Sequence, residues 1–359
     1  MKICYFGSFQ ENYQRNLIIR KGLAENNVEV LECNVPFGLE LRFWQRYSRL
    51  ISKHKNLNKD YDFLLVAEMN HKNIPLAYLI SRLYRKPLIF DPFISIYDSN
   101  VMDRKRVKPR TFAALKCLLW DKISMKLADL VLADTYQHLS YFNEKLKISE
   151  DRMGVLYVGS DDDYFNSNSS DTQPRNGFSV FFYGSFVPLQ GIEYIVKAAS
   201  LLSKEDIQFK ILGKGQTYQE IRALEKRLQP ANIRFIAPVP LEELPLHIDK
   251  SDISLGIFGN TEKTQRVIPT KVYNSLAMGK PVITGDTPAI REVFSDGKNI
   301  LLCKCANEES LAEAIMQLKK NQELRRKIAA GGHELVSEKF TQKAIGWRLI
   351  EILEEFQSK

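Results

Sequence analysis

The chain has 359 residues, 44% of them hydrophobic and 26% charged, which is the composition of a folded globular protein and excludes a disordered or fibrous chain. The length predicts two domains. The formal net charge of +8 favours an anionic partner. Because no nucleic-acid-binding motif accompanies the charge, we expect nucleotide phosphates or a membrane surface rather than nucleic acid.

Membrane-spanning and secreted proteins are also disfavoured. No apolar run is long enough to span a bilayer, and the N-terminus MKICYFGSF lacks the cleavage pattern of a secretion signal. The five cysteines lack the paired spacing of a zinc site, which predicts reduced thiols and no metal. We therefore expect a cytoplasmic protein.

The first half of the chain alternates short apolar runs with helix-like segments. Strands are predicted at residues 2–7, 28–33, 62–67, 87–91, 129–133 and 155–158, and a helix at 14–25. This alternation predicts a parallel, doubly wound sheet.

Several polar residues follow these strands, where open α/β sheets bind ligands. Gly7 ends the first strand, and Tyr13 and Arg15 begin the first helix. Asp91 and Asp98 follow the fourth strand, and His138 lies one helical turn beyond Thr135. The structural alternatives are a simple glycine turn, an exposed arginine, carboxylates that cap a loop and a solvated histidine.

Residues 166–177, NSNSSDTQPRNG, are almost devoid of apolar side chains and predict a linker. They separate a first domain, 1–165, from a second domain, 166–341, and a charged helix within 342–359 is expected to pack back on the first domain. The second half repeats the alternation, with strands at 179–184, 208–212, 233–237 and 253–257. Both halves are therefore predicted to be Rossmann-like.

The segment 266–286, RVIPTKVYNSLAMGKPVITGD, predicts a loop, a helix opening at Pro269, a glycine turn at Gly279 and a buried strand. Lys271 lies in the first turn of this helix and Asn274 one turn later. A helix N-terminus with this pair of side chains suits the phosphates and ribose of a nucleotide.

Together with YGSF at 183–186 and GKG at 213–215, this segment resembles the GT-B glycosyltransferases of family 4, glycosyl transferases group 1. The resemblance extends over almost the whole chain and implies two Rossmann-like domains that face one another across a cleft. It implies donor-binding residues Gly184, Ser185, Gln190, Gly191, Lys214, Arg266, Lys271 and Asn274. It implies catalytic residues Asp91, Asp98 and His138, with Gly7, Tyr13 and Arg15 toward the acceptor and cleft.

The chain departs from the family pattern at several of these positions. The active-site histidine that the family often places after the fourth strand is missing, and Asp91 and Phe93 stand at the nearest positions. Ser185 and Gln190 replace the usual arginine and lysine of the donor loop. The family's Glu-x7-Glu motif falls on Arg266 and Asn274. A non-catalytic subunit that binds sugar nucleotides and a nucleotide-sugar epimerase therefore remain alternatives.

The resemblance implies a retaining, metal-independent, hexosyltransferase-like enzyme without a cofactor. It would transfer a sugar from a nucleotide-diphosphate sugar to a lipid-linked or oligosaccharide acceptor in surface polysaccharide or glycolipid synthesis. Residues 41–55 predict an amphipathic helix with Trp44, Tyr47 and Ile51 near one stripe and basic side chains around it, and 104–110 add a second basic run. This pattern favours attachment to the inner face of an anionic membrane. Packing of Trp44 on the sheet is the alternative.

Overall fold

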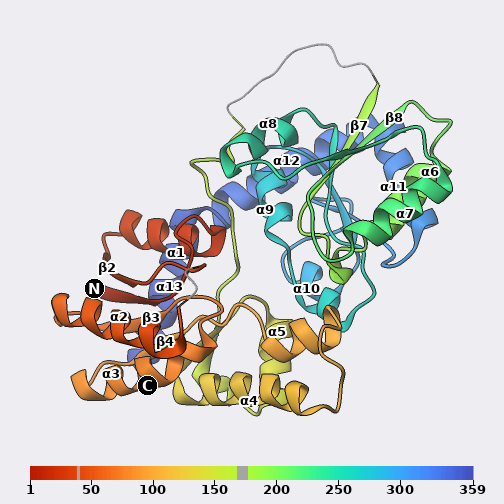
Figure 1. The fold of residues 1–359 in the computed structure, drawn as a ribbon. Coiled ribbons are helices and arrows are strands. Elements are labelled where there is room, and N and C mark those ends of the chain that lie inside the picture. The colour runs from red at the N-terminus through yellow and green to blue at the C-terminus, as the bar shows by residue number, and fades with distance from the viewer. Residues whose placement is uncertain (39–40, 168–176, 359) are drawn as a thin grey trace. The chain divides into compact units, whose positions relative to one another are not determined.

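A computed structural model describes residues 1–38, 41–167 and 177–358 (Figure 1). The chain forms two compact units. Unit 1 comprises Met1–Val158 together with Thr341–Lys359, and unit 2 comprises Gly159–Phe340. The sequence predicted the two boundaries at residues 165 and 341. Most of the predicted linker, 168–176, lies outside the described residues.

Unit 1 is built on a six-stranded parallel sheet in the order β2-β1-β3-β4-β5-β6. Its strands are β1 (Lys2–Gly7), β2 (Glu29–Asn34), β3 (Phe63–Val66), β4 (Leu88–Phe90), β5 (Leu130–Ala133) and β6 (Met153–Val155). The chain passes from β1 outward to β2 and then back to β3, on the other side of β1. The topological switch point of this sheet therefore lies between β1 and β3, where ligands of open α/β sheets bind at the carboxyl ends of the strands.

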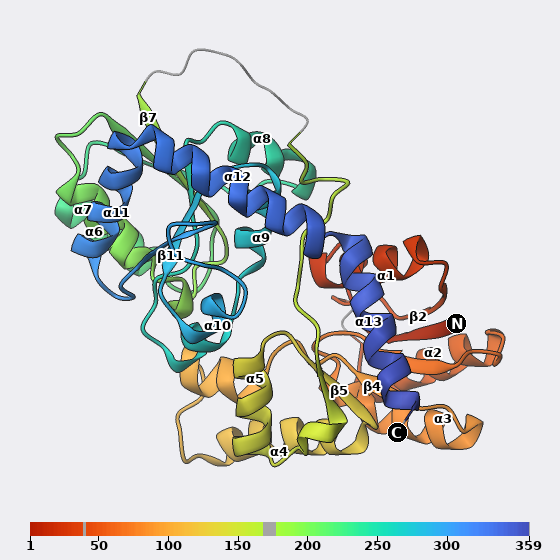
Figure 2. The same cartoon turned by 180° about the vertical axis from the view of Figure 1, so that it is seen from behind.

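Helices cover both faces of this sheet, which explains why its central strands are continuous apolar runs. The helices are α1 (Gln14–Glu25), α2 (Phe43–Asn56), α3 (Ile74–Tyr84), α4 (Phe112–Leu127), α5 (Tyr136–Tyr141) and α13 (Gln342–Gln357). One core cluster joins the sheet to α2, α3 and α4 through Leu50, Ala77 and Met125. The C-terminal helix α13 lies along α1 (Figures 1 and 2).

The contact between α1 and α13 depends on two glycines. A Cβ on Gly22 would lie 2.0 Å from the backbone oxygen of Gln342, and a Cβ on Gly346 would lie 2.1 Å from the backbone carbon of Gly22. The Asn26 side chain donates to the Lys343 carbonyl oxygen at 2.8 Å. The chain thus returns to unit 1 at its C-terminus through a close backbone-to-backbone helix crossing.

Unit 2 has a second six-stranded parallel sheet, in the order β12-β11-β10-β7-β8-β9. Its strands are β7 (Phe178–Tyr183), β8 (Ile207–Leu212), β9 (Ile233–Ile236), β10 (Ile253–Leu255), β11 (Val282–Gly285) and β12 (Leu301–Cys303). The switch point lies between β7 and β10, so a ligand is expected to bind beside the loop after β7. The predicted α/β class with two doubly wound parallel sheets is confirmed.

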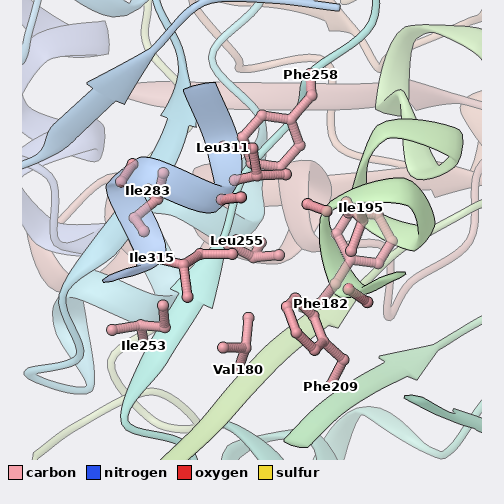
Figure 3. Close-up of a cluster of buried hydrophobic side chains, with 14 of the residues drawn as sticks. Val180, Phe182, Ile195, Phe209, Ile253, Leu255, Phe258, Ile283, Leu311 and Ile315 are labelled. Carbon is pink, nitrogen blue, oxygen red and sulfur yellow. The ribbon is translucent and has the colours of Figure 1, made fainter. Parts of the chain in front are cut away.

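The helices of unit 2 again lie on both faces of the sheet. They are α6 (Ile192–Leu201), α7 (Tyr218–Leu228), α8 (Leu244–Asp249), α9 (Thr270–Ala277), α10 (Pro288–Arg291), α11 (Glu308–Lys320) and α12 (Gln322–Lys339). Figure 3 shows the core on the side of α6 and α11, where Phe182 and Phe209 of neighbouring strands meet Ile195, Leu311 and Ile315. Phe182 is the last core residue before the loop that follows β7.

Candidate functional site

The loop after β7 opens at Gly184, next to the switch point of unit 2. Gly184 has φ of +154°, and a Cβ there would lie 2.8 Å from Nζ of Lys271. The loop continues through the exposed Ser185 into a single 3-10 turn, Pro188–Gln190, and Gly191 then starts α6 with φ of +64°. Glycine at 184 therefore leaves room for the lysine of another element to approach the end of the strand.

Lys271 projects from the first turn of α9 toward this loop. Its residue is 5% exposed, Nζ donates to Oε1 of Gln190 at 2.5 Å, and Nζ lies 3.6 Å from the centre of the Phe182 ring. Within the described residues no carboxylate forms an ion pair with it. Burial lowers the pKa of Lys271 well below its ordinary value. A desolvated amine without a carboxylate partner is a strong attractor for an anion.

Asn274 follows one turn later and is fully buried. Its Nδ2 donates to Oη of Tyr183 at 3.1 Å, and its Oδ1 accepts from Oγ of Ser160 at 3.0 Å. The first bond fixes α9 to the end of β7, and the second fixes it to the segment at the start of unit 2. The structure thus brings together four predicted donor-binding residues, Gly184, Gln190, Lys271 and Asn274. It adds Tyr183, which the sequence analysis quoted within the YGSF motif without giving it a role, and Phe182, which it did not single out.

Besides Lys271, the predicted donor site includes two further cations, and these differ in exposure. Lys214 is exposed in the loop after β8, and its carbonyl oxygen accepts from the Phe186 N–H at 3.1 Å, which places that loop beside the loop after β7. Arg266 is largely buried and pairs with Glu262 at 3.6 Å. Lys214 is therefore the more accessible cation of the two.

In unit 1, Arg15 and Asp91 form a buried ion pair with 0% exposed side chains. The Arg15 Nε donates to Oδ2 of Asp91 at 2.8 Å and Nη2 donates to Oδ1 at 3.2 Å, while Nη1 donates to the carbonyl oxygens of Leu156 and Tyr157, both at 2.9 Å. Burial acts to lower the pKa of Arg15, but the Asp91 carboxylate outweighs this effect, so that the pKa lies above its ordinary value. Both side chains are therefore buried in unit 1 and pair with one another.

The other two predicted catalytic residues are also buried. His138 is 0% exposed, its Nδ1 bonds Oδ1 of Asp134, and its ring stacks on Phe142 at 5.6 Å between centroids. Asp98 is 0% exposed, and its N–H donates to Oγ of Ser95 at 2.9 Å. Catalysis by these residues stays a prediction. Nε2 of His138 is buried and has no hydrogen-bond partner among the described residues.

Gly7 and Tyr13, in contrast, border the switch point of unit 1. A Cβ on Gly7 would lie 2.7 Å from Oδ1 of Asn70, which accepts from the Ser8 N–H, also at 2.7 Å. Tyr13 is the residue before α1 and packs edge-on to Phe93. Glu68, in the loop after β3, lies nearby and was missed, although it directly follows an apolar strand, which is the signal that singled out other residues.

A set of apolar side chains is exposed on α2, α3 and α4, which share one face of the unit 1 sheet. We call this set the apolar face: Trp44, Ile51, Leu79, Leu83, Phe112, Leu115, Leu119 and Ile123. Trp44 is 62% and Phe112 82% exposed. Of the predicted stripe of α2, Trp44 and Ile51 are therefore exposed, whereas Tyr47 is half-buried and packs with Leu50 against the core of the sheet. Among the described residues no helix is long and apolar enough to cross a membrane.

Comparisons with known proteins agree with this architecture. Residues 165–334 match the family model described as glycosyl transferases group 1. An uncharacterized glycosyltransferase of Methanocaldococcus jannaschii is 24% identical over 357 residues, covering 98% of this chain and 89% of that protein. The alpha-D-kanosaminyltransferase of Streptomyces kanamyceticus is 23% identical over 290 residues, covering 77% of this chain and 73% of that protein.

Among solved structures, the Anabaena HepE protein in complex with UDP-glucose has a TM-score of 0.74 at 16% identity, covering 99% of both chains. This likeness concerns the fold. Residues 165–334 are therefore similar to glycosyl transferases group 1, and the fold of the chain is that of the GT-B glycosyltransferases.

Proposed function

We propose that the protein transfers a sugar from a nucleoside-diphosphate sugar to a lipid-linked or oligosaccharide acceptor, with retention of the anomeric configuration. The observation that carries this proposal is Lys271, a buried amine at a helix N-terminus beside the glycine loop of the unit 2 switch point. The similar HepE protein was solved with UDP-glucose, and the similar kanosaminyltransferase is named for sugar transfer. Both support a sugar-nucleotide donor here.

The residues around Lys271 suggest how the leaving group would be stabilised. As the bond between sugar and diphosphate breaks, negative charge grows on the phosphate oxygens, and a preorganised cation lowers the barrier. Lys271 and N–H groups in the first turns of α6 and α9 would supply this stabilisation. The proposal includes no metal ion and no cofactor. Asn274 fixes α9 to the strand and thereby positions Lys271.

Turnover of nucleotide sugars with and without a mixed saccharide or glycolipid acceptor tests the proposal. A transferase consumes the donor in proportion to acceptor, whereas an epimerase converts the donor without acceptor and a non-catalytic subunit does neither. We expect nucleoside diphosphates to raise the unfolding temperature, because a ligand at about 100-fold its Kd stabilises the fold by about 2.7 kcal/mol. Stabilisation without any turnover would overturn catalysis and leave the binding subunit.

We propose further that the apolar face of unit 1 rests on an anionic membrane, as a lipid-linked acceptor would require. Exposed basic side chains flank its α4 part, among them Lys108, Arg110, Lys116 and Lys126. Apolar insertion combined with cationic flanks is the chemistry of an interfacial helix. Each basic residue near an anionic surface contributes about 1 kcal/mol. The inner face of the cell membrane is the expected site.

The expected result is co-sedimentation with phosphatidylglycerol vesicles at low salt and release at high salt. Phe112→Ser with Leu119→Ser should release the protein at low salt also, because it removes two exposed apolar groups of α4, one of them the most exposed. The matched control is Leu201→Ser with Leu246→Ser, which changes two comparably exposed leucines of unit 2. Equal recovery of the wild-type protein with phosphatidylglycerol and phosphatidylcholine vesicles would contradict the membrane proposal and favour a soluble acceptor.

A further inference from the structure

The switch point of the unit 1 sheet holds two adjoining cavities of about 140 and 210 Å³. Both are lined by Ser8, Phe37 and Met69, so they adjoin one another between the loops after β1 and β3, and we call the two together the groove. The smaller cavity also contacts Glu68 and the rings of Phe9 and Tyr13. The larger one contacts basic side chains instead. The groove is therefore carboxylic and aromatic at one end and basic at the other.

Glu68 is the polar group of the first end. It is 5% exposed, its Oε1 accepts from Nδ2 of Asn16 at 3.0 Å, and its Oε2 is buried without a hydrogen-bond partner in the part of the chain that the structure describes. The loop is held in place by Asn70, whose Nδ2 donates to the Glu68 carbonyl oxygen at 2.8 Å. A buried oxygen left without a partner is costly, so a ligand hydroxyl that reaches Oε2 gains a strong, oriented bond.

The walls beside Glu68 fit a sugar ring. Phe9 and Tyr13 line the smaller cavity, and Phe37, 65% exposed, lines both. Aromatic rings offer apolar area to the C–H faces of a ring, while one or two convergent polar groups fix its hydroxyls. A pocket of this composition favours a hydroxylated ring over a wholly charged ligand.

The second end of the groove fits an anion. Arg46 and Lys72 line the larger cavity. Nε of Arg46 is buried, and no hydrogen-bond partner for it exists among the described residues. Guanidinium and ammonium groups are the usual ligands of phosphate. The nearby His71 adds no charge, because burial lowers its pKa to about 3.

We propose that this groove binds the acceptor as a sugar phosphate, with a sugar hydroxyl on Oε2 of Glu68 and the phosphate on Arg46 and Lys72. This inference rests on the proposed sugar transfer and names its acceptor class. The phosphate is either a free monoester or the diester of a lipid-linked sugar, and the experiment below separates the two.

The proposal has a pH signature. Burial and the nearby Asp91 raise the pKa of Glu68 to about 8, against the Asn16 hydrogen bond and the Arg15 charge. The other titratable groups against it, Tyr5 and Tyr13, stay neutral because burial raises the pKa of each. Below pH 8 the Glu68 carboxyl is mostly neutral. Above it the carboxylate repels the phosphate, which is dianionic as a monoester above its pKa of about 6 and monoanionic as a diester. Affinity should therefore fall as the pH rises from about 7 to 9.

Calorimetric titration of the full-length protein tests these statements. The probes are glucose 1-phosphate, mannose 1-phosphate and N-acetylglucosamine 1-phosphate, their octyl phosphodiesters, and free glucose. Excess UDP is present throughout, so that unit 2 is occupied. We expect at least one phosphorylated probe to bind more tightly than glucose. Preference for the monoester or for the octyl diester identifies the free or the lipid-linked source.

Variants then assign the two ends of the groove. Glu68→Leu should weaken binding by about tenfold or more, because it removes a buried polar partner. Glu68→Gln, which keeps the shape and a neutral hydrogen-bonding group, should retain most of the affinity and lose its dependence on pH. Arg46→Gln should lower the affinity for the phosphorylated probes by about tenfold and leave the affinity for glucose unchanged. The exposed Glu11→Gln and Arg49→Gln are the matched controls.

Two results would overturn the proposal: no binding of any phosphorylated probe, or equal affinity in wild type, Glu68→Leu and Arg46→Gln. Retention of the pH dependence in Glu68→Gln would remove Glu68 from the site. Thermal unfolding of each variant with and without UDP reports on unit 2 independently. If UDP still stabilises Glu68→Leu and wild-type sugar transfer is observed, the proposed function stands even where the acceptor site fails.

Discussion

Lys271→Met is expected to lower kcat/KM for the nucleotide-sugar donor by about 10²–10³-fold, the scale of losing one preorganised group that stabilises developing charge. The amine lies 2.5 Å from Oε1 of Gln190 and faces the loop that opens at Gly184, so the substitution removes a buried amine beside the proposed diphosphate. Steady-state turnover at several donor concentrations measures the loss. Lys226→Met, at an exposed position of α7, is the matched control and should behave as wild type.

The stability of the same variant separates a binding role from a structural one. Burial lowers the pKa of Lys271, so the unfolded state binds this proton more tightly, and the free energy of unfolding rises with pH up to the ordinary lysine pKa of 10.5. Methionine fills a similar volume without a buried amine, so the variant should be as stable as wild type or more stable, and should lose this pH dependence. A large fall in unfolding temperature, or turnover within a factor of about three of wild type, would contradict the assignment.

The donor region could be predicted from sequence because its signals are local. Pro269, the polar first turn and Gly279 lie in one segment, and the structure places α9 at Thr270–Ala277, as the motif indicates. The strand that ends at Gly184 is equally clear from its apolar run. In a parallel doubly wound fold, the carboxyl ends of the strands and the N-termini of the helices that follow them lie at the same edge of the sheet. The proximity of Lys271, in the first turn of α9, to Gly184, after β7, therefore follows from topology.

The less predictable parts depend on which face of an element the tertiary structure buries. α12, Gln322–Lys339, was not predicted, because Gly331 and Gly332 in its middle lower helix propensity. Here the lack of a side chain at Gly332 lets the helix approach Leu276, whose Cδ2 would lie 2.4 Å from a Cβ. The apolar face has the same origin, since α4 is apolar around much of its circumference and only its packing decides that Phe112 points outward.

Buried polar groups of unit 1 illustrate the same limit. His138 and Arg15 have the residue types of an active site. The partner of His138, Asp134, lies one helical turn before it, whereas nothing in the sequence near Arg15 shows that Asp91 holds it within the unit. The Arg15–Asp91 contact joins residues 76 positions apart. Glu68 shows the reverse error, because the sequence analysis did not select this residue and the structure places it in the wall of the groove.

Arg15→Met is expected to destabilise the protein by about 3–5 kcal/mol, because it leaves the Asp91 carboxylate buried without its partner. Both side chains are 0% exposed, so water cannot replace the lost donors. Chemical denaturation followed by circular dichroism measures the change. If Arg15 instead contacts substrate, the variant should keep its stability and raise KM, which would contradict a structural role.

A double-mutant cycle resolves the contribution of the pair from the packing of each side chain. Asp91→Asn alone leaves a buried guanidinium that keeps its bonds to the Leu156 and Tyr157 carbonyl oxygens, so it should cost less than Arg15→Met. The double variant removes both charges, and its loss should be smaller than the sum of the two single losses, since neither partner is then left ionised in the interior. Strict additivity would show that Arg15 and Asp91 do not stabilise one another. The ion pair could then not explain why two charged side chains are buried in unit 1.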